Sequence, residues 1–185
     1  MYKTMGEYAE NLPVSLITQK RSIAGRAQPE LAKAKGKRFV YFEEPNEDDN
    51  YNVGIIKELT SGGLLNARGL YKEPIEFKAR FKCFCACNHL TRVPSNDGGT
   101  WRRFRVGPFT SRFVDSPDPK YPNQFLKDPT IQDKMPSWRQ AFMEILLDSF
   151  RKYRGLEKNF GSIPKEVLAA TNDYKQDSDC YFQFR

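Results

Sequence analysis

Two acidic side chains directly follow a hydrophobic segment, an arrangement that suits magnesium binding and water activation. Residues 37–42, KRFVYF, are β-branched and aromatic enough to predict a buried strand, and Glu43 and Glu44 come next. In the Walker B pattern, one such carboxylate holds Mg²⁺ directly or through water, and the other polarises an attacking water molecule. The acidic run continues through EEPNEDD, so a solvated acidic loop is the alternative interpretation.

Three further polar residues could serve the same chemistry. Asn88 ends the segment FKCFCAC, and its amide could donate to a γ-phosphate or accept from water without adding charge. Arg102 and Arg103, in GGTWRRF, could supply planar cations that stabilise a transferring phosphoryl group. Taken singly, the asparagine could cap a turn and the arginines could be surface charge. Together with the carboxylates, they provide three of the four groups that nucleoside triphosphate hydrolysis requires.

Strands and helices alternate along the segment that would position these groups. The sequence QPELAKAKG predicts a short helix before the strand 37–42, and apolar spacing from Val53 predicts another helix after it. Residues 64–79 predict a hairpin, and residues 80–87 predict a second buried strand. Because each strand ends in a polar residue where a loop begins, we expect an α/β sheet with its site along the carboxyl edge of the strands.

The remainder of the chain predicts helices joined by an irregular segment. A short strand, FRV, is predicted from Phe104, and frequent prolines over 115–136 favour an extended connection. Ser137 and Gln140 fit a capping box at the start of an amphipathic helix, and one more helix is predicted near Pro164.

The charge and hydropathy of the chain restrict its class. Lys and Arg number 30 against 23 Asp and Glu, a net charge of +7 that suits a polyanionic partner but is also common in ordinary proteins. No segment approaches the roughly 18 apolar residues of a membrane span. The first residues show no cleavage-site pattern, so we expect a soluble, intracellular protein without a membrane partner.

Three of the four cysteines alternate along one short segment. Cys83, Cys85 and Cys87 would lie on one face of a strand, which is poor geometry for disulfides. With His89 nearby they could form a zinc site, although zinc usually takes ligands from turns with C-x(2–4)-C spacing. Buried, reduced thiols are the favoured interpretation.

In this order, the motifs resemble motifs B, B-prime and C and the arginine finger of superfamily-three helicases. The resemblance is nearest to the primase-helicases of poxvirus-like and giant viruses and to related phage and plasmid primases. It rests on PELAKAKGKRFVYFEEP, IKELTSGG, ARGLYKEPIEFK and CNHLTRVPSNDGGTWRRFRV, and more loosely on IPKEVLAATNDY. It implies an α/β, AAA+-like P-loop NTPase core with a three-layer sheet in residues 1–115, truncated at its N-terminal side, and a small helical appendage in residues 116–185.

The resemblance also implies roles for individual residues. Glu43 and Glu44 would be the Walker B pair, with Glu43 binding Mg²⁺, and Asn88 would be the sensor. Arg102 would be the arginine finger, with Arg103 beside it. ATP and Mg²⁺ would be the cofactors, a hexameric ring the working assembly, and viral DNA replication in the host cytoplasm or a replication factory the setting.

The predicted hairpin corresponds to the element that grips single-stranded DNA in the channel of such rings. Arg68, Tyr71 and Lys72 would be its DNA-binding residues. A cation can neutralise phosphate, and an aromatic ring can stack on a base. An exposed hairpin with ordinary turn residues is the alternative.

The phosphate-binding loop of the family, G-x-x-x-x-G-K-[ST], does not occur in these 185 residues. The nearest sequence, AKGKR at 34–38, follows a helix and leads into a strand, the reverse of the order that a phosphate cradle needs. We therefore expect negligible hydrolysis by the isolated chain, and an upstream Walker A and primase portion as its partner. A split gene, a truncated reading frame and an accessory subunit all fit. The leading hypothesis is a segment of an ATP-dependent DNA helicase, and the rival is a non-catalytic module or accessory fragment that binds single-stranded nucleic acid.

Overall fold

The protein is described by a computed structural model covering residues 1–20, 27–155 and 163–179. The elements up to the third strand of the main sheet are α1 (Tyr2–Met5), the 3-10 helix η1 (Gly6–Tyr8), β1 (Ala9–Leu12), α2 (Ser15–Thr18), α3 (Pro29–Lys33), β2 (Phe39–Phe42), α4 (Val53–Thr60), β3 (Leu64–Arg68), β4 (Pro74–Lys78) and β5 (Lys82–Cys85). The later elements are α5 (Gly98–Trp101), β6 (Arg112–Val114), β7 (Gln124–Leu126), α6 (Ile131–Lys134), α7 (Arg139–Gly155) and α8 (Lys165–Ser178).

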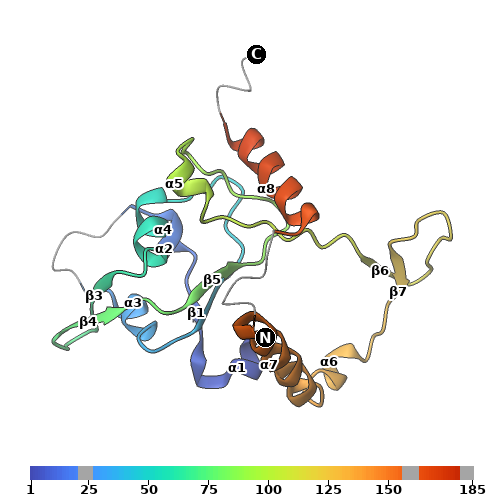
Figure 1. The fold of residues 1–185 in the computed structure, drawn as a ribbon, viewed down its shortest axis with the longest axis horizontal. Helices are drawn as coiled ribbons and strands as arrows, with labels where there is room; N and C mark the ends of the chain where they lie inside the picture. Colours follow the sequence, from blue (N-terminus) through green and yellow to red (C-terminus); the bar gives the residue numbers. More distant parts are fainter. Residues whose placement is uncertain (21–26, 156–162, 180–185) are drawn as a thin grey trace.

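A parallel three-stranded sheet lies at the centre, in the order β1-β2-β5 (Figure 1). In the register of the sheet, Phe42 at the end of β2 is level with Leu12 of β1 and Cys85 of β5. The carboxyl ends of all three strands therefore meet at one edge, as parallel pairing requires. The strand predicted over 37–42 is confirmed as β2, slightly shortened, whereas β1 was not predicted.

One face of this sheet forms the core. Val40 and Phe42 point into a buried cluster with residues of α2, α4 and the hairpin, including Ile17, Leu59 and Leu65. The opposite face carries Phe39 and Tyr41 of β2 and Phe84 of β5, and Phe84 there is about half exposed. The described residues therefore form a mixed α/β structure with small sheets, and the three-layer P-loop fold stays a prediction.

The hairpin predicted over 64–79 is confirmed. Strands β3 and β4 pair antiparallel, with Leu65 opposite Phe77, and both side chains are buried while their sequence neighbours are exposed. This alternation fixes the register, because a slip by one residue would expose the buried set.

The strand predicted at FRV is wrong. Phe104, Arg105 and Val106 are not in a strand, and Phe104 and Val106 contact α8 instead. The backbone N–H of Val106 donates to Thr171 Oγ1 over 3.0 Å, and the Phe104 ring lies 5.7 Å from Trp101 between ring centroids. Aromatic packing thus accommodates the Phe104 ring, and the Thr171 hydroxyl accepts the backbone N–H that would otherwise need a carbonyl of a neighbouring strand.

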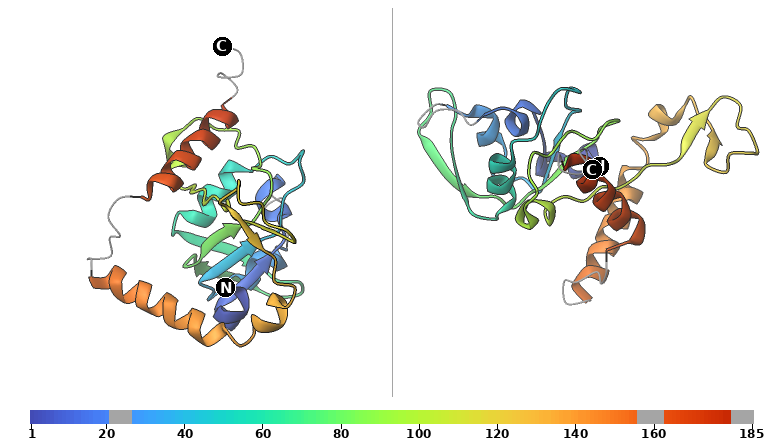
Figure 2. Two further views of the ribbon diagram at one scale, coloured as in Figure 1. Left: turned by 90° about the vertical axis from the view of Figure 1, so that its right-hand side faces the viewer. Right: turned by 90° about the horizontal axis from the view of Figure 1, so that it is seen from above.

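The region predicted as an extended connection has structure of its own. Strands β6 and β7 form a short parallel pair in an arm that projects from the body, and α6 follows it (Figure 2). The predicted capping box is also wrong: Ser137 Oγ donates backwards to the carbonyl of Lys134 over 2.7 Å, and Gln140 Nε2 donates to Glu144. The amphipathic helix itself is confirmed as α7.

Helix α8 returns to the body and closes over the α5 turn. The Tyr174 hydroxyl donates to the backbone carbonyl of Thr91, and the Tyr174 ring meets Trp101 edge-to-face at 5.3 Å between centroids. Burial raises the pKa of the Tyr174 hydroxyl, which keeps it a neutral donor. The helix predicted near Pro164 is therefore confirmed, with Tyr174 on its buried face.

Removing the Tyr174 hydroxyl should measurably destabilise the fold. We expect Tyr174→Phe to lower the free energy of unfolding by about 1–3 kcal/mol, because the buried carbonyl of Thr91 loses its donor. Urea unfolding followed by fluorescence measures the change. Tyr121→Phe, at an exposed tyrosine of the arm, is the control and should leave the unfolding midpoint unchanged. Equal midpoints for both variants would contradict the assigned role of the hydroxyl.

Candidate functional site

The carboxyl edge of the parallel sheet brings together the predicted strand-end residues. Glu44 is the second residue after β2, and its carboxylate accepts hydrogen bonds from both the backbone N–H and the side-chain amide of Asn88, the latter over 3.0 Å. Glu43 Oε1 accepts from Asn11 Nδ2 of β1 over 3.0 Å. The two carboxylates are thus held by partners on opposite sides of β2.

Asn11 belongs to this cluster and was missed by the sequence analysis. The segment AENL has little β-propensity, so nothing predicted a strand there or a polar group at the site. Its Oδ1 atom is buried and accepts no hydrogen bond from the described residues. A buried oxygen without a donor costs free energy unless a cation or water satisfies it.

An open depression of about 520 Å³ lies beside the cluster, between the loops that follow β2 and β5. It is lined by Glu44, Pro45, Asn46, Glu47, Asn88, His89, Leu90 and Thr91. The ionised side chains in this lining are acidic, so an anionic ligand would enter only together with a cation.

The alternating cysteines lie beside this edge as free thiols. Cys83, Cys85 and Cys87 are partly buried, and burial raises the pKa of Cys83 to about 12. Cys85 Sγ donates to the backbone carbonyl of Glu43 at 3.6 Å. Within residues 1–20, 27–155 and 163–179, no three His, Cys, Asp or Glu side chains are grouped so that they could hold a metal, and Cys180 lies outside these ranges.

The two arginines after α5 have different environments. Arg102 is exposed, and its guanidinium makes no hydrogen bond or ion pair with the described residues. Arg103 is partly buried, and its Nη1 donates to the carbonyl of Thr60 over 3.1 Å. The described contacts join neither arginine to Glu43 or Glu44, so the structure does not assemble all the predicted groups into one centre.

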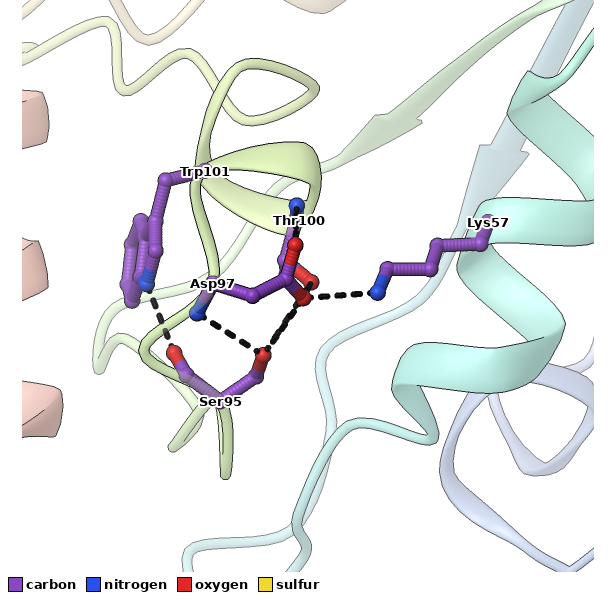
Figure 3. A network of polar contacts seen from close by, with 5 residues as sticks. All are labelled: Lys57, Ser95, Asp97, Thr100 and Trp101. Atoms are coloured by element: carbon purple, nitrogen blue, oxygen red, sulfur yellow. Dashed lines mark hydrogen bonds and ion pairs between the residues drawn. The ribbon is translucent and has the colours of Figure 1, made fainter.

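The turn that carries these arginines is held by a network around Asp97 (Figure 3). Asp97 caps α5 by accepting from the backbone N–H of Thr100 at 3.1 Å and from its hydroxyl at 2.6 Å, and Ser95 Oγ donates to the same carboxylate. Lys57 Nζ of α4 lies 2.6 Å from Asp97 Oδ2. Lys57 first, and then Thr100, hold the pKa of the Asp97 carboxyl well below its usual range. Sequence reasoning missed this network, although Asp97 before GGT fits an N-cap.

The hairpin displays its predicted DNA-binding residues on the surface. Arg68, Tyr71 and Lys72 are all exposed, and the Tyr71 ring makes no contact that shields it. Tyr71 has φ of 55°, a left-handed conformation that is uncommon for a bulky residue. Such strain is found more often at binding sites than elsewhere.

Comparison with known proteins places the chain in a family. Residues 3–103, more than half of the chain, match the "Family of unknown function (DUF5906)". The chain belongs to this family. A DUF5906 assignment carries no activity by itself, so the named relatives are the more informative comparison.

The relatives of this DUF5906 chain include large viral proteins. It is 41% identical over 192 residues to a protein named "putative helicase" from Acanthamoeba polyphaga mimivirus. This alignment covers 98% of this chain and 19% of the relative. It is 32% identical over 191 residues to a "putative helicase" of frog virus 3, and 29% identical over 185 residues to a "putative primase" of African swine fever virus, again over 19% of each relative. The resemblance to viral primase-helicases is thereby confirmed, for a chain that spans about a fifth of these proteins.

None of the helices within the described ranges is both long enough and apolar enough to cross a bilayer.

Gly99 should be required by the Asp97 network, whereas its neighbour Gly98 should not. A Cβ at Gly99 would lie 2.7 Å from Asp97 Oδ1, while a Cβ at Gly98 would meet nothing within 4 Å. We expect Gly99→Ala to lower the free energy of unfolding by about 0.5–2 kcal/mol, the usual cost of losing an N-cap, because the carboxylate must move from Thr100. Gly98→Ala is the matched control, and urea unfolding of both variants measures the difference. Equal destabilisation by the two substitutions would contradict this account.

Proposed function

We propose that this DUF5906 chain is a segment of an ATP-dependent DNA helicase that acts in viral DNA replication. The observation that carries the proposal is the meeting of Glu43, Glu44 and Asn88 at the carboxyl edge of the parallel sheet. Two carboxylates and an amide at adjacent strand ends are the groups that hold Mg²⁺, activate water and sense a γ-phosphate. The viral relatives named as helicases or primases support the same function.

The donor atoms at this edge fit Mg²⁺. Hard cations take oxygen ligands, and Mg²⁺ is usually bound through one or two carboxylates together with waters and substrate phosphates. Glu43 would be that carboxylate, and the unsatisfied Oδ1 of Asn11 supplies a further oxygen beside it. Glu44, fixed by two hydrogen bonds from Asn88, would orient the attacking water.

The phosphate cradle has to come from a segment outside these 185 residues. Among the described residues, the outer edge of β5 has no strand partner. A further parallel strand added at that edge would bring its following loop to Asn88 and the depression of about 520 Å³. We propose that the phosphate-binding loop of the complete helicase reaches the site in this way, within an AAA+-like three-layer fold.

The exposed arginine fits a role between subunits. Because the Arg102 guanidinium is free of contacts with the described residues, it can reach a nucleotide held by an adjacent copy. This supports a homo-oligomeric ring, hexameric as in superfamily-three helicases, as the working assembly.

The hairpin supports a second candidate function that does not involve the carboxylates. Arg68, Tyr71 and Lys72 present two cations and an aromatic ring without any contribution from the sheet edge. A non-catalytic module that binds single-stranded nucleic acid would need only this element, so the two functions are separated by testing the carboxylates.

Substitution of both carboxylates tests the helicase function. In a complete DUF5906 protein that carries both this segment and a G-x-x-x-x-G-K-[ST] loop, we expect Glu43→Gln with Glu44→Gln to lower ATP hydrolysis by about 10²-fold or more, because metal binding and water activation are both impaired. Steady-state phosphate release measures the effect. Asp48→Asn, at an exposed carboxylate of the same acidic loop that does not line the depression, is the control. ATPase and unwinding activity that survive the double substitution would exclude the helicase role and leave the binding module.

Substitutions at the hairpin tip test DNA binding by the chain itself. We expect Tyr71→Ala to cost about 1–3 kcal/mol of single-stranded DNA binding free energy through lost stacking. Lys72→Ala should lower the slope of log K against log salt concentration by about 0.7, the value for one phosphate contact. Fluorescence anisotropy of a labelled oligothymidylate at several salt concentrations measures both, with Lys120→Ala as the control at an exposed lysine between β6 and β7, in the arm on the opposite side of the molecule (Figure 1). Binding that is unchanged by both tip substitutions would place the DNA elsewhere.

A further inference from the structure

We infer that α4 is a rigid connector between the hairpin and the arginine-bearing turn, with Lys57 and Arg103 as the positioning residues that lock it in place. The inference rests on the proposed DNA binding by the hairpin and adds a route by which bound DNA sets the position of Arg102. It is carried by contacts at the middle and at the C-terminal end of α4.

The first lock joins the middle of α4 to the cap of α5. Lys57 Nζ lies 2.6 Å from Asp97 Oδ2, the same oxygen that accepts from the Thr100 hydroxyl at 2.6 Å. Lys57 and Asp97 are 40 residues apart in sequence, on either side of the hairpin and β5. Exposed ion pairs add little to stability, and the side chains of this pair are 39% (Lys57) and 50% (Asp97) exposed. The main effect of the pair is therefore to fix the position of α5 relative to α4.

The second lock holds the C-terminal end of α4. Arg103 Nη1 donates to the carbonyl of Thr60, the last residue of the helix, and lies 3.4 Å from Thr60 Oγ1. The last carbonyls of a helix have no partner within it and carry the negative end of the helix dipole, so a guanidinium fits there. Arg103, the sequence neighbour of Arg102, is thus hydrogen-bonded to the end of α4.

The link from α4 to the hairpin is short and internally bonded. Only Ser61, Gly62 and Gly63 separate Thr60 from β3. Ser61 Oγ donates to the carbonyl of Glu58 and accepts from the backbone N–H of Gly63, which ties the link to the helix. The carbonyl of Gly63 in turn accepts from the N–H of Ala79, just beyond β4. A movement at the base of the hairpin is therefore transmitted to α4 instead of being absorbed by a loose loop.

Trp101 lies at the far end of this route and can report on it. It is buried, its Nε1 donates to the carbonyl of Ser95 at 2.7 Å, and it belongs to the turn capped by Asp97 (Figure 3). The protein has 2 tryptophans, so Trp138→Phe leaves Trp101 as the sole indole. Because Trp101 is buried, bases cannot stack on it, and DNA bound at the hairpin can change its emission only through the protein.

The experiment titrates the Trp138→Phe form of this chain with oligothymidylate and follows both Trp101 emission and the anisotropy of labelled DNA. We expect an emission change that saturates with the same Kd as binding. Lys57→Met and Arg103→Gln should each reduce its amplitude by about threefold or more, as expected for residues on a coupling route, while the Kd changes by no more than about twofold. Lys57→Arg should restore the amplitude. Lys35→Met is the matched control, because it removes the same charge from an exposed lysine that belongs neither to α4 nor to the α5 turn.

The outcomes separate the inference from the proposed function. No DNA binding by the parent protein would remove the hairpin assignment itself. DNA binding without an emission change in the parent would overturn the connector and leave the hairpin assignment intact. An emission change of equal amplitude in Lys57→Met, Arg103→Gln and Lys35→Met would show that α4 is not the route.

Discussion

Parallel pairing of β2 with both β1 and β5 determines which side chains of this chain can act together. The register makes Leu12, Phe42 and Cys85 level with one another, so the residues that follow them emerge at the same edge. This register brings Asn88 close to Glu43 and Glu44. No local turn could do so, because Glu44 and Asn88 are 44 residues apart in sequence. The buried side chains of Val40 and Phe42 hold the register, because a one-residue slip would turn them to the opposite face.

The sequence was informative where a local pattern coincided with the final environment. The compact run of β-branched and aromatic residues in FVYF predicted β2. The alternation in the second arm of the hairpin predicted β3 and β4, because a strand with one buried face shows that face as a period of two. The sequence-based predictions failed where the structure of a segment depends on partners far away in the sequence. The strand β1 has a polar, low-propensity sequence and forms only because β2 provides its partner, and with it Asn11 was missed. Phe104 and Val106 resemble a strand in composition, but their partners are Trp101 and Thr171.

The segment NDGGTWRRF shows how a motif that suggests catalysis can be mostly architectural. Asp97 caps the turn, Gly99 leaves room for the carboxylate, and Trp101 anchors the turn against α8. Of its two arginines, only Arg102 is exposed. The turn thus holds one exposed cation directly after a short helix, and the proposed arginine finger would need such a fixed position, because charge stabilisation is most effective when the cation is preorganised.

The hydrogen bond between Val106 and Thr171 closes a loop of 65 residues that contains the arm, α6 and α7. The entropy of closing a flexible loop grows only with the logarithm of its length, about 0.6 kcal/mol for each doubling. Insertions or deletions within this loop therefore barely affect the packing of α8 on the turn. The length and surface of this loop can thus change while the sheet edge and the arginine turn stay the same.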